Sequence, residues 1–418
     1  MKSKFTNWLL FLFAASFLAS CVKDKCTRTY TFYVPVYKTT DEVRANIKSN
    51  APRKVERPGK LFVLGNYIFL NEMDRGVHVI DNANPSAPKN VAFIDMPGNI
   101  DLAVKGNTLY ADAYTDLVTL DITNPLQVAV KSIKGNAFPF RRYTNGFVSD
   151  NNKVIVDWVK KDTTVVIDCN GGDGFLGCRG CFVVTDAAFA STSKTSGPFG
   201  AGIAGSMARF SIVSNYLYTV SDRELKVFSI SNAADPQFIR HIDMGWGIET
   251  IYPFKDKLFI GSNTGMFIYG LQNPSFPNQL GTFSHVRTCD PVIADDKYAY
   301  VTLRSGNICT GFTNQMEVLD IANLSSPVLV KTYPLFNPHG LSKDGNTLFI
   351  CDGKEGLKIF NASLAHDIRL VKQIKDIETY DVIAYNNLAL VVAKDGLYQF
   401  DYADLNNVRL LSKIGYQQ

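Results

Sequence analysis

A short apolar run that is followed by a polar residue and a turn recurs along the chain. Clear copies read GVHVIDNANPS at 76–86, DLVTLDITNPL at 116–126, MFIYGLQNPS at 266–275 and LYQFDYADL at 397–405. The runs are too short for ordinary helices and are rich in β-branched and aromatic residues, which indicates strands. Self-similarity at a period of about 40 residues predicts a repeat architecture, either a solenoid or a propeller.

The stretch between two copies contains the signals of three further strands. In the second repeat the expected strands are 101–105, 108–114, 117–122 and 128–133. Gly106-Asn107 supplies the tight turn between the first two, and no helical spacing is visible. Four short antiparallel strands in a repeat of this length form one propeller blade. We therefore predict an all-β fold, a β-propeller of four-stranded antiparallel blades.

The residue that ends each third strand predicts the number of blades. These positions are Asp81, Asp121, Asp186, Ser229, Gly270, Asp320, Asn361 and Asp401. They favour eight blades, with seven as the alternative because the repeat at 136–206 is degenerate. The polar side chain is expected to accept hydrogen bonds from the following turn, and the ring to close by packing of the last blade on the first. The residues expected to be buried between blades are Val79, Leu120, Val227, Ile268, Leu319 and Ile359.

The N-terminus has the pattern of a targeting segment. Lys2 and Lys4 precede an apolar stretch at 8–17 that is too short to span a bilayer. Leu18-Ala19-Ser20-Cys21 resembles a bacterial lipobox, in which the Cys is acylated and becomes the first mature residue. An ordinary secretory leader with a coincidental Cys is the alternative. Several acyl chains on Cys21 would anchor the protein stably to a membrane, whereas a single chain binds only marginally.

Three segments follow from this pattern. We predict a lipoprotein signal peptide at 1–20, a lipidated tether and lead-in at 21–59, and the propeller at 60–418. In the lead-in, a strand interrupted by Pro35 is expected at 30–37 and a short helix at 41–49. The second mature residue is not Asp, which by resemblance to sorting rules in some Gram-negative bacteria favours the outer membrane.

Four long phrases carry a family resemblance. They are GVHVIDNANPSAP at 76–88, GNIDLAVKGNTLYADAYTDLVTLDI at 98–122, CDPVIADDKYAYVTLRSGNICTG at 289–311 and NPHGLSKDGNTLFICDGKEGLKIF at 337–360. The chain from 60 to 418 resembles the LVIVD-repeat family of bacterial surface and periplasmic lipoproteins. The resemblance implies a β-propeller, and it implies no established reaction.

Charge and motifs narrow the range of functions. The formal net charge is +4, and removing Lys2 and Lys4 with the leader leaves 41 basic against 39 acidic groups, or +2. This balance gives no electrostatic basis for binding nucleic acid. The chain contains no HExxH, P-loop, Rossmann fingerprint or GxSxG motif. The acidic, Gly-rich loop at 168–181 has Gly172 and Arg179 where a calcium loop needs oxygen ligands. We expect no metal and no cofactor.

Eight cysteines are present, and a secreted protein can form disulfides. We expect Cys289 and Cys309 to form a disulfide that pins the long hairpin insertion of their repeat. Cys351 follows an apolar run and is expected to be a buried thiol. The pairing of Cys26 is left open. Cys169, Cys178 and Cys181 crowd one loop, where a structural bridge is favoured over zinc because no His lies nearby.

The start of each inner strand carries a polar or charged residue. In a propeller the equivalent ends of the inner strands converge on the central channel. By alignment of the repeats, to within one residue, these positions hold Asp101, Arg209, Glu249, Asp290, His339 and Asp381. One interpretation is that these side chains satisfy one another and trapped water. The other is that they form a ligand site at one channel mouth, with Arg209 and His339 as donors and the carboxylates as acceptors.

Three functions are compatible with this sequence. We favour a cell-envelope binding or interaction scaffold that uses a propeller face or the central funnel, since no nucleophile–base pair is visible and fold alone implies no catalysis. An enzyme that processes glycans or peptides with the funnel carboxylates is one alternative. A structural subunit of an outer-membrane assembly is the other. The expected partners are the membrane, through the lipid anchor, and an envelope protein or a glycan-like ligand.

Overall fold

The regular secondary structure of the described chain consists almost entirely of β-strands. The computed structural model describes residues 25–138, 152–168, 193–195, 203–284, 291–305 and 313–416. Contacts divide the chain into two units. The first unit comprises Met1–Thr39 and Arg142–Ala187, and the second comprises Thr40–Arg141 and Ala188–Gln418.

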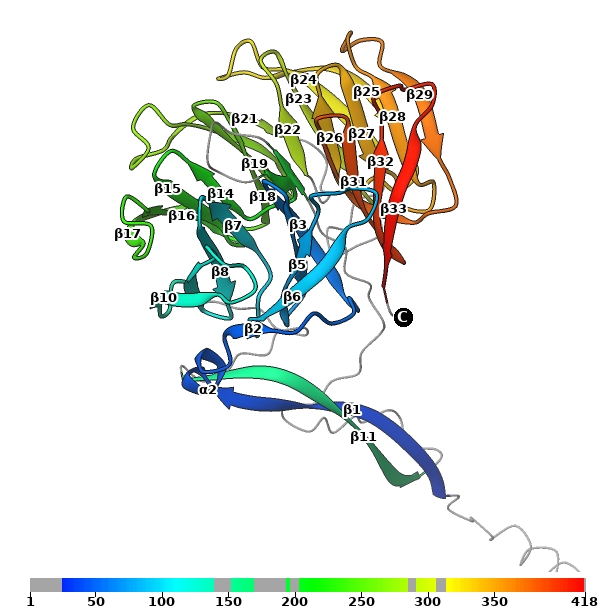
Figure 1. Cartoon of the computed structure of the whole chain (residues 1–418). Helices are drawn as coiled ribbons and strands as arrows, with labels where there is room; N and C mark the ends of the chain where they lie inside the picture. The colour runs from blue at the N-terminus through cyan, green and yellow to red at the C-terminus, as the bar shows by residue number, and fades with distance from the viewer. Residues whose placement is uncertain are drawn as a thin grey trace, which may run out of the picture. The chain divides into compact units, whose positions relative to one another are not determined.

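Seven four-stranded antiparallel meanders form the propeller of the second unit (Figure 1). Blade 1 is β3 (Pro58–Leu64), β4 (Tyr67–Glu72), β5 (Gly76–Asp81) and β6 (Lys89–Asp95); blade 2 is β7 (Leu102–Lys105), β8 (Thr108–Ala113), β9 (Asp116–Asp121) and β10 (Ala129–Lys134). Blade 3 is β14 (Phe210–Val213), β15 (Tyr216–Val220), β16 (Glu224–Ser229) and β17 (Gln237–Asp243); blade 4 is β18 (Ile248–Phe254), β19 (Lys257–Ser262), β20 (Gly265–Gly270) and β21 (Asn278–Ser284). Blade 5 is β22 (Val292–Ala294), β23 (Tyr298–Leu303), β24 (Gln315–Asp320) and β25 (Val328–Pro334); blade 6 is β26 (Leu341–Asp344), β27 (Thr347–Cys351), β28 (Leu357–Asn361) and β29 (Arg369–Ile374). Blade 7 is β30 (Thr379–Tyr385), β31 (Leu388–Ala393), β32 (Gly396–Asp401) and β33 (Arg409–Gly415).

The predicted β-propeller is confirmed, and the blade count is seven, the alternative, rather than the favoured eight. The degenerate repeat forms no blade in the described chain. Its strand β11 (Lys153–Asp168) instead pairs antiparallel with β1 (Lys25–Thr39) in the first unit. The reason is visible in the sequence, because β11 contains no Gly, Asn or Pro that would let it turn back into two short strands. Pro35 does not interrupt β1 but lies opposite Trp158, which a strand with one free edge tolerates.

The polar side chains that end the third strands accept hydrogen bonds from the following turns, as predicted, except in blade 4, where Gly270 has no side chain to do so. Asp121 Oδ1 accepts a hydrogen bond from the backbone N of Thr123 at 2.9 Å, and Asp320 Oδ1 accepts one from Ala322 at 2.8 Å. Asn361 makes the same contact with the backbone N of a Ser at 3.0 Å, so an amide replaces the acid without loss of the turn. Each third strand also has a bulge in its pairing with the fourth strand, which increases the local twist.

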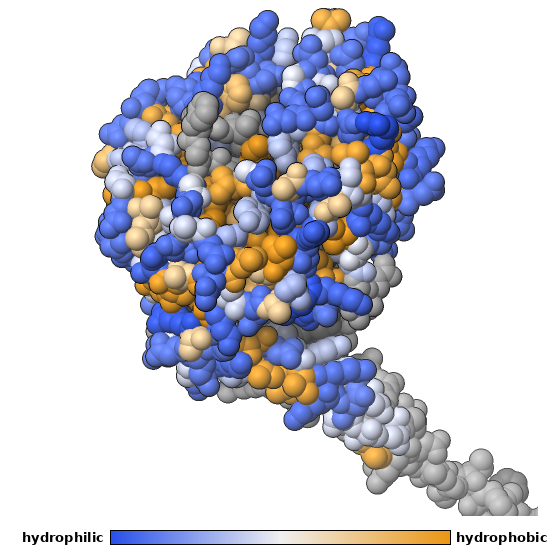
Figure 2. All heavy atoms as spheres, in the orientation of Figure 1, coloured by the Kyte–Doolittle hydropathy of each residue, from blue (hydrophilic) through white to orange (hydrophobic). Residues whose placement is uncertain are grey.

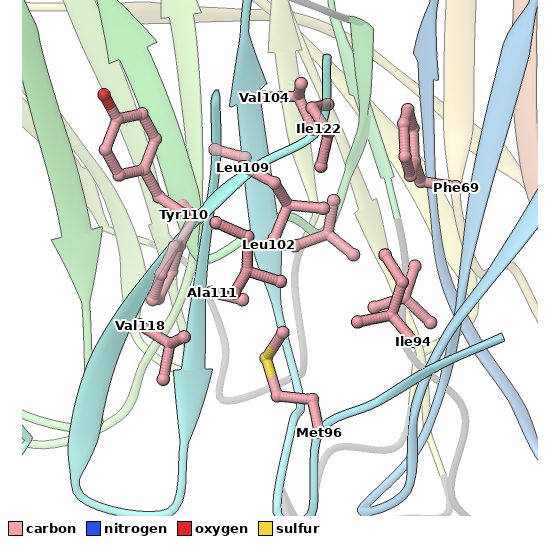
Figure 3. Packing of buried hydrophobic residues seen from close by; sticks show 14 of the residues in the cluster. Phe69, Ile94, Met96, Leu102, Val104, Leu109, Tyr110, Ala111, Val118 and Ile122 are labelled. Carbon is pink, nitrogen blue, oxygen red and sulfur yellow. The ribbon is translucent and has the colours of Figure 1, made fainter. Parts of the chain in front are cut away.

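Apolar side chains fill the space between neighbouring blades (Figure 3). Between blades 1 and 2, Phe69 and Ile94 lie in one buried cluster with Leu102, Leu109 and Val118. The six residues predicted to be buried, Val79, Leu120, Val227, Ile268, Leu319 and Ile359, are all fully buried. This confirms the buried positions that were predicted from the repeat.

The ring closes through side chains, as predicted, because no sheet of the described chain combines strands of the first and last blades. Leu61 and Ile80 of blade 1 share a buried apolar cluster with Leu390 of blade 7. Two hydrogen bonds join the same blades. The Nε2 atom of buried Gln399 donates to Asn82 Oδ1 at 2.7 Å, and Ser412 Oγ donates to a blade 1 turn carbonyl at 2.6 Å.

The lead-in is partly built into the propeller. The helix α2 (Thr40–Arg44) is shorter than the expected helix at 41–49, because the chain becomes a strand again at β2 (Lys48–Asn50). β2 pairs antiparallel with β6 and covers the outer edge of blade 1. The Nε atom of Arg44 donates to the buried carboxylate of Asp116 at 2.7 Å, so the helix is tied to blade 2.

The fourth strands leave apolar side chains on the surface. Val328 of β25 is 60% exposed and Leu370 of β29 is 49% exposed. Figure 2 shows such apolar patches scattered among hydrophilic side chains over the propeller. Lys331 and Lys372 lie on these two strands, and charged side chains of this kind keep strand edges from pairing with other chains.

Candidate binding site at the starts of the inner strands

The inner strands bring the predicted site residues to equivalent places in their blades. Asp101 directly precedes β7, Arg209 directly precedes β14, Glu249 is the second residue of β18, His339 lies two residues before β26, and Asp381 is the third residue of β30. Asp290 lies outside the described residues. Asp101 and Arg209 lie in one cluster and His339 lies in a second, Glu249 acts on the second through its charge, and Asp381 lies beside Cys351.

The first cluster joins blades 1, 2 and 3 around one carboxylate. Asp101 forms an ion pair with Lys60 of β3, and the two side chains are 3% and 7% exposed. The same carboxylate accepts hydrogen bonds from the backbone N of Arg209 and, at 2.7 Å, from that of Leu102. One acidic side chain therefore fixes the entry of three successive blades.

Lys60 is a site residue that the sequence analysis missed. It stands six residues before Asn66, and Asp101 stands six residues before Asn107, so the two are equivalent positions of the repeat. Alignment on the turn Asn would have found it.

Buried amides and a second carboxylate hold Asp101 in place. The Oδ1 atom of Asp112 accepts hydrogen bonds from the backbone N atoms of Ile100 and Asp101, both at 2.8 Å, and from Asn99 Nδ2 at 2.9 Å. Asn71 of β4 donates to Asn99 Oδ1 at 2.6 Å. Such a network fixes the geometry of the cluster, because each member would be costly to leave unpaired.

Opposing electrostatic effects act on the ammonium of Lys60. Burial lowers its pKa, the charge of Asp101 opposes this shift, and the nearby positive charge of Arg209 adds to it. The guanidinium of Arg209 also lies 3.4 Å from an Asp222 oxygen. Positive and negative groups thus alternate around the start of these strands.

The second cluster joins blades 5, 6 and 7 around His339. The Nη1 atom of Arg304, which directly follows β23, lies 3.0 Å from His339 Nδ1 and 3.2 Å from Nε2. Asn337 Nδ2 lies 3.2 Å from Nε2, and the ring of Tyr380 packs edge-on at 5.4 Å between centroids. The Thr302 hydroxyl donates to the His339 carbonyl at 2.8 Å.

These contacts decide the charge states in the second cluster. Burial and the positive charge of Arg304 lower the pKa of His339 to about 3, so the imidazole is neutral at ordinary pH. Burial also lowers the pKa of Arg304, and the charge of Glu249 opposes that shift. The guanidinium still carries its charge at ordinary pH.

Asp381 lies beside a buried thiol. Its side chain is fully buried, and its Oδ1 atom accepts a hydrogen bond from the backbone N of Val382 at 2.7 Å. Burial, with the charge of Asp381 as a further cause, raises the pKa of Cys351 well above its ordinary value. Cys351 is the free, buried thiol that was predicted.

A short strand occupies the central channel. β13 (Ile203–Ser206) pairs with β3 and with β12 (Ser193–Thr195), and it contacts the inner strands of blades 4, 6 and 7. The fully buried Ser206 accepts a hydrogen bond at Oγ from the backbone N of Leu341, at 3.2 Å. The channel is therefore filled by the chain at this level.

Several predicted features lie outside the described residues. These are the signal peptide, Cys21, the Cys289–Cys309 pair, Asp290 and the three-Cys loop at Asp168–Cys181. Of that loop, only the backbone of Asp168 is described. In the described part of the chain, no cluster of three His, Cys, Asp or Glu residues could hold a metal ion. Within the same part, no helix has the length and apolar character needed to cross a membrane.

The architecture and the sequence comparisons agree on the class of protein. Seven four-stranded blades built from repeats define a β-propeller repeat protein. The model of the LVIVD repeat matches residues 59–94, 99–133, 204–243 and 288–334, which fall in blades 1, 2, 3 and 5. Four of the seven blades thus contain a segment that matches the LVIVD repeat.

Known structures are similar in fold. The computationally designed Ika8 protein is 11% identical with a TM-score of 0.51, and the match covers 88% of this chain and 92% of Ika8. Sqt1 of Saccharomyces cerevisiae is 9% identical with a TM-score of 0.51, over 92% of this chain and 88% of Sqt1. At such identity the likeness concerns the fold alone. No curated protein matches the chain.

Proposed function

We propose that the protein is a non-catalytic binding scaffold of the bacterial cell envelope, held at the outer membrane by lipid on Cys21, and that its channel mouth binds a small polar or glycan-like ligand. A β-propeller repeat protein fits a binding scaffold role. The envelope location rests on the lipobox-like Leu18–Cys21 and on the resemblance to LVIVD-repeat lipoproteins.

The observation that carries the binding proposal is the clustering of charges at the inner-strand starts. Lys60, Asp101 and Arg209 meet across three blades, and Arg304 and His339 meet across two more. Fixed donors and acceptors of both signs are the groups that orient a polar ligand in a concave site.

The charge states support binding rather than catalysis. A general acid or base works best with a pKa near the operating pH. His339 has a pKa of about 3 and is enclosed by Arg304 and Asn337, so it is a poor proton acceptor at neutral pH.

The anchor is tested by replacing the acylated residue. We expect Cys21→Ser to release a soluble protein that folds as the wild type does, whereas the wild type stays with the membrane after washing. A Cys21→Ser protein that remains bound to washed membranes contradicts the lipid anchor.

The ligand site is tested with the double variant Arg209→Ala/Asp290→Ala in a screen of glycans and peptides. We expect the wild type to bind members of the screen and the double variant to lose this binding while its thermal unfolding stays cooperative. Turnover of a bound glycan or peptide would favour the enzyme instead. Absence of binding by the wild type, together with partners that co-purify equally with both proteins, would favour a structural subunit.

A further inference from the structure

The guanidinium of Arg304 lies at the end of the second strand of blade 5, beside His339 of blade 6, and has no carboxylate partner in the described chain. We propose that Arg304 is the anchor for a carboxylate of the ligand, so that the ligand is an acidic sugar of the uronate class. This inference rests on the proposed function, because it names the ligand group that the same mouth would recognise.

The immediate neighbour of Arg304 is a neutral ring and not an anion. Its Nη1 atom reaches both nitrogens of His339, at 3.0 and 3.2 Å. A single nitrogen cannot make two in-plane hydrogen bonds to one imidazole, so the guanidinium lies against the ring. His339 therefore positions Arg304 but does not neutralise it.

The surroundings of His339 are rigid. The fully buried carboxylate of Asp352 accepts hydrogen bonds from the backbone N atoms of Phe336, at 3.0 Å, and Asn337, at 2.7 Å, and from Lys358 at 2.5 Å. These bonds fix the loop that carries Asn337 and His339. A preformed donor geometry of this kind lowers the conformational entropy that the protein would lose when a ligand binds.

Other arginines of the propeller show what is missing at Arg304. Arg44 donates to Asp116 at 2.7 Å, and Arg75 pairs with Glu56 and Glu72. Among the described residues, no carboxylate oxygen lies within 4.0 Å of an Arg304 guanidinium nitrogen, the distance of an ion pair. Glu249 acts on Arg304 only through its charge. A partly buried cation without a paired anion is costly, and a ligand carboxylate would compensate it.

The geometry of guanidinium favours a carboxylate over other ligand groups. Its planar array of donors matches two carboxylate oxygens, and charge-assisted bonds of this type are about twice as strong as neutral ones. Among the described residues, the polar contacts of the Arg304 guanidinium use Nη1 alone. Donors on Nε and Nη2 are the groups that would meet the ligand.

The experiment compares acidic sugars with their uncharged methyl esters. A panel of uronate oligosaccharides, each beside its methyl ester, is titrated by calorimetry into the full chain at neutral pH. The ester keeps the sugar and removes the charge. We expect at least one acid to bind about ten-fold or more tighter than its ester, which is the effect of one good charge-assisted contact.

Variants assign that preference to Arg304. Arg304→Gln should bring the affinity for the acid down to that for the ester, and Arg304→Lys should retain part of the preference because it keeps the charge but not the planar fork. Arg369→Gln is the matched control, since Arg369 is 76% exposed on the outer strand of blade 6 and should leave binding unchanged. Thermal unfolding of each variant checks the fold.

Each outcome decides the inference. Equal binding of acids and esters by the wild type, or an undiminished preference in a folded Arg304→Gln protein, overturns it. If neutral glycans bind and lose binding in Arg209→Ala/Asp290→Ala while no acid is preferred, the proposed function stands and this inference fails. If no glycan of either kind binds, both fail. A sugar phosphate that binds as tightly as the uronate would show that the site binds oxyanions in general. That result also overturns the assignment to carboxylates.

Discussion

Lys60 and Asp101 form an ion pair between the inner strands of blades 1 and 2, and both side chains are almost completely buried. Each charge is tolerated only because the other is present, and the backbone N of Arg209 depends on the same carboxylate. The pair therefore couples the entry points of three blades.

Asp101→Ala should destabilise the protein strongly. The change leaves the Lys60 ammonium buried without its partner, which typically costs about 3–5 kcal/mol. Chemical denaturation at neutral pH measures the loss. The double variant Lys60→Met/Asp101→Ala should recover part of it because the uncompensated charge is gone. A loss below about 1 kcal/mol for Asp101→Ala would show that water or a shift of Lys60 replaces the ion pair.

His339 should make folding sensitive to acid. Its pKa is about 3 in the folded protein and 6.5 in an unfolded chain. As the pH falls, the unfolded state therefore binds the proton before the folded state does. The contribution of His339 to the free energy of unfolding is highest above pH 6.5, falls as the pH drops from 6.5 to 3, and is constant below 3. The full difference is on the order of 5 kcal/mol.

The free energy of unfolding at several pH values checks this slope. His339→Gln should flatten it between pH 6.5 and 4, while His366→Gln, at an exposed position, should not. An unchanged slope in the His339→Gln protein would mean that another group, rather than this imidazole, takes up the proton on unfolding.

Gly356 and Gly345 form a matched pair that tests whether the close approach of two strands requires glycine. Gly356 directly precedes β28 and has φ +80°, and a Cβ there would lie 2.0 Å from the Ile374 carbonyl oxygen. Gly345 has φ +54° and open space around it. Gly356→Ala should cost several kcal/mol, since the backbone must move, while Gly345→Ala should cost only about 1 kcal/mol for its left-handed conformation. Equal losses by thermal or chemical denaturation would contradict the close approach.

The Cys289–Cys309 disulfide stays a prediction. Peptide mapping after alkylation without reductant should find both thiols blocked in one linked peptide pair, and reduction should free them. Cys351 serves as the internal control, because a buried thiol should be alkylated only after the protein is denatured. Two alkylated cysteines at 289 and 309 in the native, oxidised protein would exclude the bridge.

The repeat was predictable because its signals are local. The carboxylate of Asp121 accepts a hydrogen bond from a backbone N two residues away, and Leu120 lies in the apolar run of a single strand. The blade count could not be predicted from local signals alone. The run at 153–168 forms no blade because it pairs with β1. No local pattern encodes that partner, which lies more than 100 residues earlier in the chain.

The site was predictable only in part, for the same reason. The starts of the inner strands follow from repeat alignment, which located Asp101 and Arg209 and would have located Lys60. Arg304 lies at the end of a second strand and meets His339 from a distance of 35 residues in sequence. Such a contact depends on how two blades pack, and the repeat pattern contains no signal for it.

The strand β13 has a consequence for the order of assembly. It lies among the inner strands of blades 1, 4, 6 and 7, yet it precedes blades 3 to 7 in the chain. During synthesis it is made before most of the ring that surrounds it. No threading through a finished ring is then required, because blade 7 is made last and docks on blade 1 around a strand that is already in place.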